Sequence, residues 1–437
     1  MSFHLKSIAV INKVKRLLAF LKGYLLAKRG KHLSREKIDK MQLKAFNNFK
    51  RNVLVQSSYY SAYLTDNLQQ FPVINKAIHM SNFNTINTQK LLKEDALNIA
   101  IQSEHSRNFK PEYKGFSVGL SSGTSGNRGL FVVSEQEQAQ WVGYIIGKML
   151  PLSIKKHRVA FFLRANNNLY QSANGLMVSF QFFDLINGIS ANINELNNFS
   201  PTLLIAPGSV LRRIAQSPTH ISPSRVIAVA EVLEHEDRQI IEQRFNIKVE
   251  QIYQCTEGFL AATCSAGNLH LNEDTCIIEK QWLDKSTGRF SPIVTDLRRT
   301  TQPVVRYLLD DVLIEDTTPC ECGSAMTRIK NIEGRCDDVL KFKGIAGADV
   351  DVFSDYIRNT IISSSDKIEH YKLTQTDKNK VLIEIHPLTP KIINNITQGL
   401  DDLWRRLSVI PPEYTFKAIP LKVGIEKQRR VVRLCNG

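Results

Sequence analysis

Residues Ser121–Gly129 read SSGTSGNRG and lie between two apolar runs, Phe116–Leu120 and Leu130–Val133. The loop packs three glycines among five hydroxyl and amide side chains, and Arg128 adds a positive charge. Glycines between two strands can turn successive backbone N–H groups toward one point. We therefore expect this loop to bind a polyphosphate. It lacks the Gly-Lys-Ser/Thr ending of a P-loop, and a flexible surface turn is the alternative interpretation.

The composition is that of an ordinary globular protein, but the charge is not. The chain has 437 residues, enough for two or more domains, of which 43% are hydrophobic and 23% charged. The net charge is +15, and the first forty residues contribute +9 through eleven Lys or Arg and two acids. More than half of the excess positive charge therefore lies in one N-terminal segment.

This segment, residues 1–40, is predicted to form a basic amphipathic helix. Basic side chains alternate with apolar ones at helical spacing, the apolar positions being Val10, Ile11, Val14, Leu17, Leu18, Leu21 and Leu25. The charges are too frequent for a transmembrane span, and no secretory signal is expected. We expect the apolar stripe to pack on the body of the protein; contact of residues 1–30 with an anionic membrane surface is the alternative. Nucleic-acid binding is not expected, because no recognition motif accompanies the charge.

The cysteines indicate a reducing compartment. Seven cysteines in a chain of this length do not suggest a disulfide framework. With no export signal, we expect a cytoplasmic protein, either free or peripheral to the inner face of the membrane.

The alternation of strands and helices predicts an α/β fold. Between about residues 116 and 330, apolar β-type runs such as Val159–Leu163 and Val249–Tyr253 are separated by helix-like stretches such as Glu236–Phe245. A helix is expected after Ser134, because S-E-Q-E fits a capping box with Glu137. These features predict a large N-terminal domain of mixed sheets and helices.

The C-terminal hundred residues differ in character. A small α+β domain is expected from about residue 335, with a helix over Val350–Ile362, a hairpin around Asp377–Asn379 and a helix over Lys391–Leu407.

Four further stretches carry chemistry when they are taken together. In YQCTEG, Tyr253–Gly258, a Thr and a Glu suit a phosphate oxygen and Mg²⁺ at a strand end. RYLLDDV, Arg306–Val312, supplies a carboxylate for ribose hydroxyls. EGRCDDVLKFKG, Glu333–Gly344, suits a hinge, and GIEKQRRV contains Lys427, which a mobile segment can deliver to a transition state. Each stretch alone is weak evidence for this chemistry. The ordinary alternatives, in the same order, are a helix start, a strand end, a charged linker and a basic terminus.

In their order along residues 121–431, these motifs resemble the adenylate-forming (acyl/aryl-CoA ligase) superfamily, and within it the phenylacetate–CoA ligase branch. The segment FPVINKAIHMSNFNTINT, Phe71–Thr88, also resembles a subgroup of adenylating enzymes. The resemblance implies a large AMP-binding domain over residues 41–334 and a small mobile domain over residues 335–437. It also implies ATP as cosubstrate, Mg²⁺ as cofactor and an acyl-AMP intermediate.

The resemblance further implies roles for single residues. The β- and γ-phosphates of ATP would be held by the loop residues Ser121, Ser122, Gly123, Thr124, Ser125, Gly126 and Arg128. Thr256 would contact the α-phosphate and Glu257 would hold Mg²⁺. The adenine would pack near Ala230, Glu231 and Tyr253.

The remaining implied roles fall near the C-terminal domain. Asp311 would bind the ribose, and Arg335 would stand at the nucleotide end of a hinge that pivots at Asp337. Lys427 would reach the carboxylate and the α-phosphate. The chain departs from the family pattern at Arg128, where a Lys is usual, and at Glu426, where a Gly is usual. YQC before Thr256 and LLDD at Asp311 are also unusual.

Two segments together offer a zinc ligand set. Cys264 and His270 form a C-x₅-H half, and Cys320 and Cys322 form a C-x-C half. Three sulfurs and one imidazole are a valid tetrahedral set for structural Zn²⁺, although the spacing departs from the commoner C-x₂-C. Some relatives of phenylacetate–CoA ligase carry a metal at this place. The alternative is four reduced side chains without metal.

The substrate and the acceptor are less defined. The resemblance implies a carboxylic acid, aromatic or unsaturated, whose pocket lies between Val159 and Tyr253. The alternatives for Phe161–Gly175 are a polar wall of this pocket and a solvated turn. The acceptor would be CoA, a carrier-protein thiol or an amine. The competing hypothesis is a zinc-stabilised basic binding protein that keeps the adenylate-forming fold without ligase activity.

Overall fold

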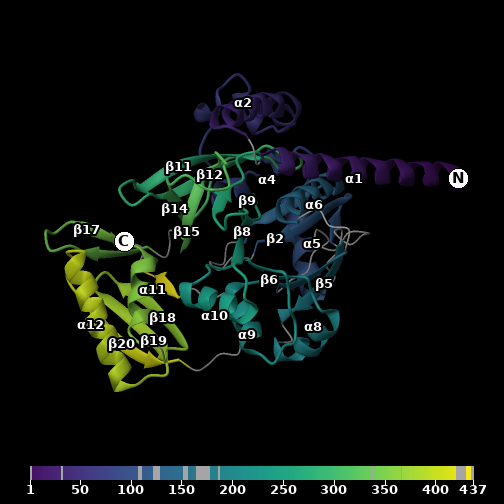
Figure 1. The fold of residues 1–437 in the computed structure, drawn as a ribbon. Helices are drawn as coiled ribbons and strands as arrows, with labels where there is room; N and C mark the ends of the chain where they lie inside the picture. The colour runs from purple at the N-terminus through teal and green to yellow at the C-terminus, as the bar shows by residue number, and fades with distance from the viewer. Residues whose placement is uncertain are drawn as a thin grey trace. The chain divides into compact units, whose positions relative to one another are not determined.

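The computed structural model describes residues 2–434, apart from 31–32, 107–110, 122–127, 151–155, 164–177, 186–187, 336–338, 366 and 420–429 (Figure 1). At 2–11, 104, 163, 335 and 355 it describes the backbone alone. The chain forms two compact units. Unit 1 comprises Met1–Trp282, Pro292–Leu309 and Glu315–Lys330; unit 2 comprises Leu283–Ser291, Asp310–Ile314 and Asn331–Gly437.

The centre of unit 1 is a parallel sheet with the strand order β5-β4-β6-β7-β8. Its strands are β4 (His157–Leu163), β5 (Val178–Asp184), β6 (Leu203–Ala206), β7 (Arg225–Ala228) and β8 (Val249–Cys255). The central strands β6 and β7 are largely buried, as parallel strands require, whereas β5 and β8 are mostly half-buried. Three helices connect them, α8 (Ile193–Phe199), α9 (Gly208–Gln216) and α10 (His235–Phe245). All five strands therefore end at one edge of the sheet.

Antiparallel strands extend this sheet beyond β8. The pairing continues through β9 (Gly258–Thr263) and β10 (Leu269–Leu271) to β15 (Arg328–Arg335). Strand β11 (Cys276–Asp284) follows β10 in the chain, and β12 (Arg289–Asp296) pairs with β13 (Val304–Leu308). The prediction of mixed sheets in a large α/β region is confirmed.

The first hundred and thirty residues build a helical layer and a small sheet. The helices are α2 (Arg35–Asn52), α3 (Lys76–Ser81), α4 (Phe83–Ile86) and α5 (Lys93–Ser106), with 3₁₀ turns at Leu54–Gln56, Tyr60–Tyr63 and Leu68–Gln70. The sheet has the order β1-β2-β3, with β1 (Glu112–Tyr113), β2 (Phe116–Leu120) and β3 (Leu130–Val133). After β3, Ser134 and Glu137 form the predicted capping box of α6 (Glu135–Met149).

Helix α1 (Ser2–Gly30) packs along α6, but not through its apolar stripe. The contact face is made of small residues, and Val14, Leu17, Leu18, Leu21 and Leu25 remain exposed. The expectation that this stripe packs on the body is therefore wrong. Residues 1–40 are also not one helix, because α1 ends at Gly30 and α2 begins at Arg35. Within the described residues, no helix combines the length and apolarity needed to cross a bilayer.

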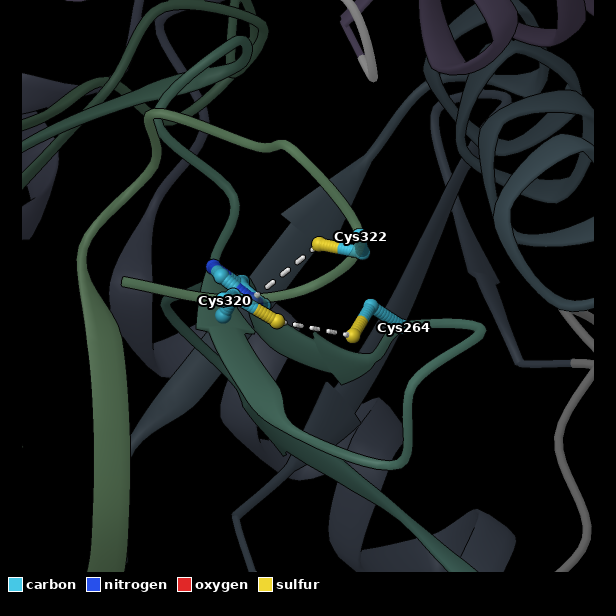
Figure 2. A group of neighbouring side chains, drawn as sticks. Cys264, Cys320 and Cys322 are labelled. Carbon is cyan, nitrogen blue, oxygen red and sulfur yellow. Dashed lines mark hydrogen bonds between the residues drawn. The ribbon is translucent and has the colours of Figure 1, made fainter. Parts of the chain in front are cut away.

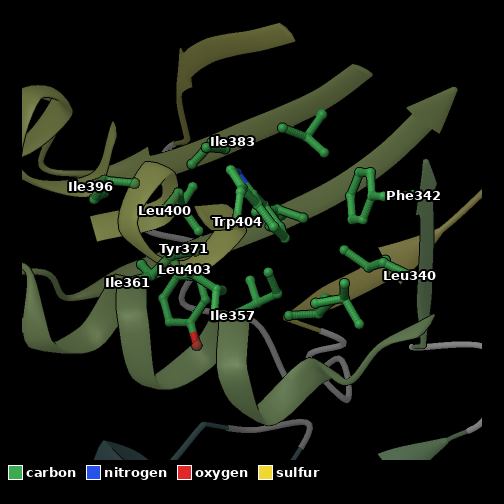
Figure 3. Close-up of a cluster of buried hydrophobic side chains, with 14 of the residues drawn as sticks. Leu340, Phe342, Ile357, Ile361, Tyr371, Ile383, Ile396, Leu400, Leu403 and Trp404 are labelled. Carbon is green, nitrogen blue, oxygen red and sulfur yellow. The ribbon is translucent and has the colours of Figure 1, made fainter. Parts of the chain in front are cut away.

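Unit 2 is an α+β unit around one apolar core. Its main sheet has the order β20-β19-β18-β21, and Trp404 is fully buried among aliphatic side chains beside Phe342 (Figure 3). The elements after β15 are β16 (Leu340–Lys343), β17 (Asp349–Val352), α11 (Ser354–Ser363), β18 (His370–Asp377), β19 (Lys380–His386), α12 (Pro390–Arg406), β20 (Glu413–Ala418) and β21 (Val431–Arg433).

The hairpin and the last helix of unit 2 are as predicted, but one boundary is not. Val350–Val352 belongs to β17, which pairs with β16, and the helix begins only at Ser354. The alternating D-V-D-V pattern at Asp349–Val352 is that of a half-buried strand, and this period of two overrides the helical pattern that follows. Strand β14 (Asp311–Asp316) pairs with β12 through Leu313 and Ile314.

Candidate functional site

The ends of the predicted phosphate loop are fixed by hydrogen bonds. Strands β2 and β3 pair up to Leu120 and Leu130, so the loop connects two antiparallel strands as expected. The Ser121 N–H donates to the Gly129 carbonyl at 2.7 Å, and the Gly129 N–H donates to Ser121 Oγ at 2.7 Å. The Arg128 Nε donates to the Ser121 carbonyl at 3.0 Å. Ser122, Gly123, Thr124, Ser125 and Gly126 lie outside the described residues.

Thr256 and Glu257 form the tight turn between two antiparallel strands. Cys255 of β8 pairs with Gly258 of β9, so these two residues are the whole connection. The Thr256 hydroxyl donates to Glu257 Oε2 at 2.8 Å. The turn lies where parallel strand β8 ends, which is the edge of an α/β sheet at which ligands bind. Tyr253, which lies in β8 three residues before Thr256, is buried.

The predicted adenine-packing residues follow the neighbouring strand. Ala230 and Glu231 follow β7 after one intervening residue, Val229. Because β7 pairs in parallel with β8, they lie at the same sheet edge as Thr256. Ala230 has φ of 65°, a left-handed conformation that is uncommon for a residue other than glycine. Glu231 Oε2 accepts a hydrogen bond of 2.7 Å from the Ser209 hydroxyl, beside the N-terminus of α9. Glu231 is therefore tied to α9.

A short segment that the sequence did not single out joins the turn to the loop. We call Arg299–Pro303 the bridging segment. At its start, Arg299 Nη1 donates to the Thr256 carbonyl at 2.9 Å. Further along, Gln302 accepts from the Val132 N–H at 2.8 Å and donates to the Leu130 carbonyl at 3.0 Å. The bridging segment thus connects the Thr256–Glu257 turn to the strand that leaves the phosphate loop.

Two further contacts hold the bridging segment. Glu137, the capping residue of α6, accepts from the backbone N–H groups of Thr300 and Thr301 at 2.6 and 2.9 Å. On another side, His79 Nε2 lies 3.5 Å from the Pro303 carbonyl oxygen, and its ring meets Tyr307 edge to face at 5.5 Å. His79 belongs to the Phe71–Thr88 segment, which places that segment beside the candidate site.

Two buried ionisable groups near the turn have shifted pKa values. Burial lowers the pKa of His79 to about 4, with Arg299 acting in the same direction and Glu257 opposing them. Burial raises the pKa of Asp296 to about 6, against the attraction of Arg299 and Arg298. Asp296 Oδ1 accepts from the Arg298 N–H at 2.8 Å. The region around Glu257 is therefore a desolvated cluster of opposite charges, which is typical of functional sites.

The other predicted nucleotide residues lie elsewhere in the chain or outside the description. Asp311 begins β14 and belongs to unit 2. Arg335 ends β15, where only the backbone is described, and Asp337 and Lys427 lie outside the described residues. Their roles stay predictions.

The four predicted metal ligands come together in unit 1 (Figure 2). Cys264 follows β9, His270 lies in β10, and Cys320 and Cys322 lie between β14 and β15. Their ligand atoms all lie within 4.8 Å of one another. The Sγ atoms of Cys264 and Cys320 are 3.7 Å apart, too far for a disulfide, and Cys322 Sγ is 3.6 Å from His270 Nε2.

This geometry fits a tetrahedral zinc ion. With Zn–S of about 2.3 Å and Zn–N of about 2.0 Å, two sulfurs lie roughly 3.8 Å apart and a sulfur and a nitrogen roughly 3.5 Å apart. The observed separations of 3.7 and 3.6 Å agree with both values. His270 Nδ1 lies 2.9 Å from the Met326 carbonyl, so the proton sits on Nδ1 and Nε2 keeps its lone pair. Asn268 donates to Cys320 Sγ at 3.2 Å, as an outer-shell partner of a thiolate does.

The other described cysteines do not join this cluster. Cys276 is buried, and burial raises its thiol pKa well above the usual range. Cys255 donates weakly to the Gly258 carbonyl at 3.8 Å. Cys336 and Cys435 lie outside the described residues.

Comparison with known proteins supports the resemblance in sequence and in fold. No family model matches the chain. Phenylacetate-coenzyme A ligase of Thermus thermophilus is 22% identical over 197 residues, a match that covers 41% of this chain and 43% of that ligase. The matched part is thus less than half of the length of that relative.

The structural likeness is more extensive. A crystal structure of 2-hydroxyisobutyryl-CoA ligase in the postadenylation state, in complex with 2-HIB-AMP, matches with a TM-score of 0.67 and 14% identity. The match covers 93% of this chain and 91% of that one. An open conformation of the same ligase, in complex with 2-HIB-AMP and CoA, matches with a TM-score of 0.58, 14% identity and 92% of both chains. The chain therefore has the fold of this CoA ligase, and its similarity to a phenylacetate-coenzyme A ligase agrees with the predicted resemblance.

Proposed function

We propose that this chain uses ATP to adenylate a carboxylic acid, releases pyrophosphate, and transfers the acyl group to a thiol or an amine. One observation carries this proposal: in a fold similar to that of a CoA ligase, the bridging segment links the Thr256–Glu257 turn, through Arg299, to the strand that leaves the glycine-rich loop, through Gln302. The turn also shares a sheet edge with Ala230 and Glu231. The residues assigned to the α-phosphate and the adenine thus meet at one edge.

The residues then have complementary tasks in the proposed reaction. A carboxylate oxygen attacks the α-phosphorus, the bond between the α-phosphorus and the bridging oxygen breaks, and pyrophosphate leaves. Both reactants are anions, so backbone N–H groups of Ser121–Gly129 and the charge of Arg128 would offset their repulsion. Mg²⁺, when bound, adds further positive charge, and Glu257 is the residue that would hold it. The Thr256 hydroxyl would orient the α-phosphate, Asp311 the ribose, and Lys427 the reacting carboxylate.

The substrate and the acceptor remain the less defined part of the proposal. The acid is proposed to be aromatic or unsaturated, because the sequence relative is a phenylacetate ligase. CoA is the favoured acceptor, because the structural relative was crystallised in complex with CoA. A carrier-protein thiol or an amine is the alternative acceptor.

The metal cluster is proposed to hold a structural Zn²⁺. Four protein ligands would leave no open position for a water molecule, so the ion would not take part in adenylation. It would tie the segment after β9 to the Cys320–Cys322 turn within unit 1. We also propose that the protein is cytoplasmic and that residues 335–437 form a mobile domain. Residues 1–30 are proposed to contact the membrane.

Acid-dependent exchange of labelled pyrophosphate into ATP tests the reaction. We expect exchange with at least one acid from a panel of aryl and unsaturated acyl acids, and its loss in Lys427→Ala. Lys417→Ala is the matched control, since Lys417 is an exposed lysine on β20. No exchange with any acid, together with salt-sensitive binding to nucleic acid, would instead support the basic binding protein.

A further inference from the structure

Helix α1 is anchored to α6 through a row of small residues on one face. A side chain at Gly23 would overlap the Gln140 carbonyl, and one at Gly143 would overlap the Phe20 carbonyl. A Cβ at Gly147 would lie 2.7 Å from Ala27 Cβ. Such close backbone approach is possible only where both helices carry small residues. It determines which face of α1 points toward α6.

Two further contacts tie α1 to unit 1, one from Arg16 on the Gly23 face and one from Lys28, whose position on the helix falls next to Leu21. Arg16 pairs with Glu135 at 3.9 Å, and Lys28 Nζ donates to the Leu150 carbonyl at 3.4 Å. Ala27 is fully buried in the core that α1 shares with α6. The orientation of the helix about its own axis is thus specified by packing and not by its apolar stripe.

The apolar stripe lies on the opposite face, and its members with described side chains are exposed. Of the seven residues of the stripe, the five with described side chains have exposed fractions of 43–61%. At 3.6 residues per turn they fall within an arc of about 100°, centred opposite Gly23 and Ala27. These five are Val14, Leu17, Leu18, Leu21 and Leu25. Five exposed aliphatic side chains in one row form a continuous apolar surface. Such a surface marks an interaction site, whereas single exposed apolar residues do not.

Basic residues border this stripe, Lys28 lies within its arc, and no acid interrupts it. Lys15, Lys22 and Arg29 recur every seventh residue and line one side, and Lys13 lies on the other. All four are exposed. Ser2–Gly30 contains no Asp or Glu. An apolar row between cationic borders matches the interface of an anionic bilayer, where acyl chains lie beneath negative headgroups.

We infer that α1 is a membrane-surface helix that docks unit 1 on anionic phospholipid. The apolar stripe enters the headgroup–acyl boundary, and the lysines and the arginine meet the phosphates. The charge pattern favours this occupant over a second copy of the chain, because two α1 helices stacked stripe to stripe would bring their own cations together. This inference does not depend on the proposed ligase activity.

Flotation of the full-length protein with vesicles tests the inference. Vesicles of phosphatidylcholine alone are compared with vesicles of equal parts phosphatidylcholine and phosphatidylglycerol. The test variant is Leu17→Glu with Leu21→Glu. The matched control is Leu43→Glu with Val55→Glu, which adds the same charges at residues that are 63% and 51% exposed outside α1.

We expect the wild type and the control to float with the anionic vesicles only. The test variant should lose at least about tenfold in partition coefficient, because two aliphatic side chains no longer enter the interface. Lys15→Gln with Lys22→Gln should weaken binding by a similar factor, and high salt should weaken wild-type binding.

A spectroscopic measurement separates a lipid contact from a protein contact. Leu18→Trp fluorescence should shift to the blue with anionic vesicles and be quenched by brominated acyl chains. Equal flotation of the wild type and the stripe variant would overturn the inference. So would an unshifted Leu18→Trp spectrum with vesicles, or a wild-type dimer that the stripe variant converts to a monomer without any change in flotation.

Discussion

Arg299 Nη1 donates a hydrogen bond of 2.9 Å to the carbonyl oxygen of Thr256, forty-three residues earlier in the chain. This contact fixes the backbone of the turn that carries the proposed α-phosphate and Mg²⁺ residues. The same bridging segment is held by Glu137 and bonds to β3 through Gln302. The geometry of the candidate site therefore depends on a segment that itself carries none of the predicted nucleotide contacts.

Replacing Arg299 should impair adenylation more than stability. In Arg299→Ala the Thr256 carbonyl loses its donor and the turn is free to shift, so the exchange rate should fall by at least about tenfold. Arg299→Lys should recover part of the loss, because an ammonium can donate one such bond. Pyrophosphate exchange and thermal melting, measured on the same preparations, check this. An Arg299→Ala protein with wild-type exchange would contradict the role of the contact.

Purified protein should contain about one equivalent of zinc, because the Cys264, His270, Cys320 and Cys322 atoms already have tetrahedral separations. Elemental analysis measures the content. Cys264→Ser should lower it and reduce the melting temperature, whereas Cys255→Ser should keep the metal. Less than about half an equivalent in the wild type, purified without chelator, would exclude a structural zinc site.

Asp296 should destabilise the fold as the pH rises. Its folded pKa of about 6 lies above the ordinary 3.8, so the folded state binds the proton more tightly. Its favourable contribution is complete below about pH 4 and is lost as the pH rises through about 6. Asp296→Asn should therefore be more stable than the wild type at pH 8, by up to about 3 kcal/mol, and not at pH 4. Denaturant unfolding at several pH values measures the difference; a gain that is the same at both pH values would be inconsistent with this assignment.

His79 should have the opposite pH dependence. Its folded pKa of about 4 lies below the ordinary 6.5, so protonation favours the unfolded state. Its stabilising contribution is present above about pH 6.5 and is lost as the pH falls through about 4. In His79→Gln this loss of stability at low pH should disappear. The loss of stability at high pH that Asp296 causes should remain, no longer offset by His79. If the free energy of unfolding of His79→Gln changed with pH between about 4 and 6.5 as it does in the wild type, the prediction would be contradicted.

The sequence predicts local features of this fold well. The apolar runs give β4 and β6 to β8, S-E-Q-E gives the capping box at Ser134, and the glycine-rich loop joins two strands as expected. The metal cluster is also predicted, because the residue types Cys264, His270, Cys320 and Cys322 identify their chemistry without any knowledge of the fold. Each of these signals resides in the residues themselves or in their immediate neighbours.

Contacts between distant segments are what the sequence does not reveal. Nothing in the sequence pattern shows that Arg299 and not Arg298 reaches Thr256, or that Gln302 reaches β3 across 170 residues or more. For α1, the helical period identifies an apolar stripe but not which face packs. The small residues Gly23 and Ala27, with Gly143 and Gly147 of α6, are the signal that could have indicated the packed face.

Transfer of an oxygen atom tests the central claim most directly. The best acid from the exchange panel, labelled with ¹⁸O in its carboxylate, is incubated with ATP, Mg²⁺ and hydroxylamine as an amine acceptor, and the nucleotide products are analysed by mass spectrometry. If the carboxylate attacks the α-phosphorus, the AMP that is released carries one ¹⁸O atom from the acid, and Glu257→Gln forms little of it. Unlabelled AMP, or ADP and phosphate as the products, would contradict acyl-adenylate formation.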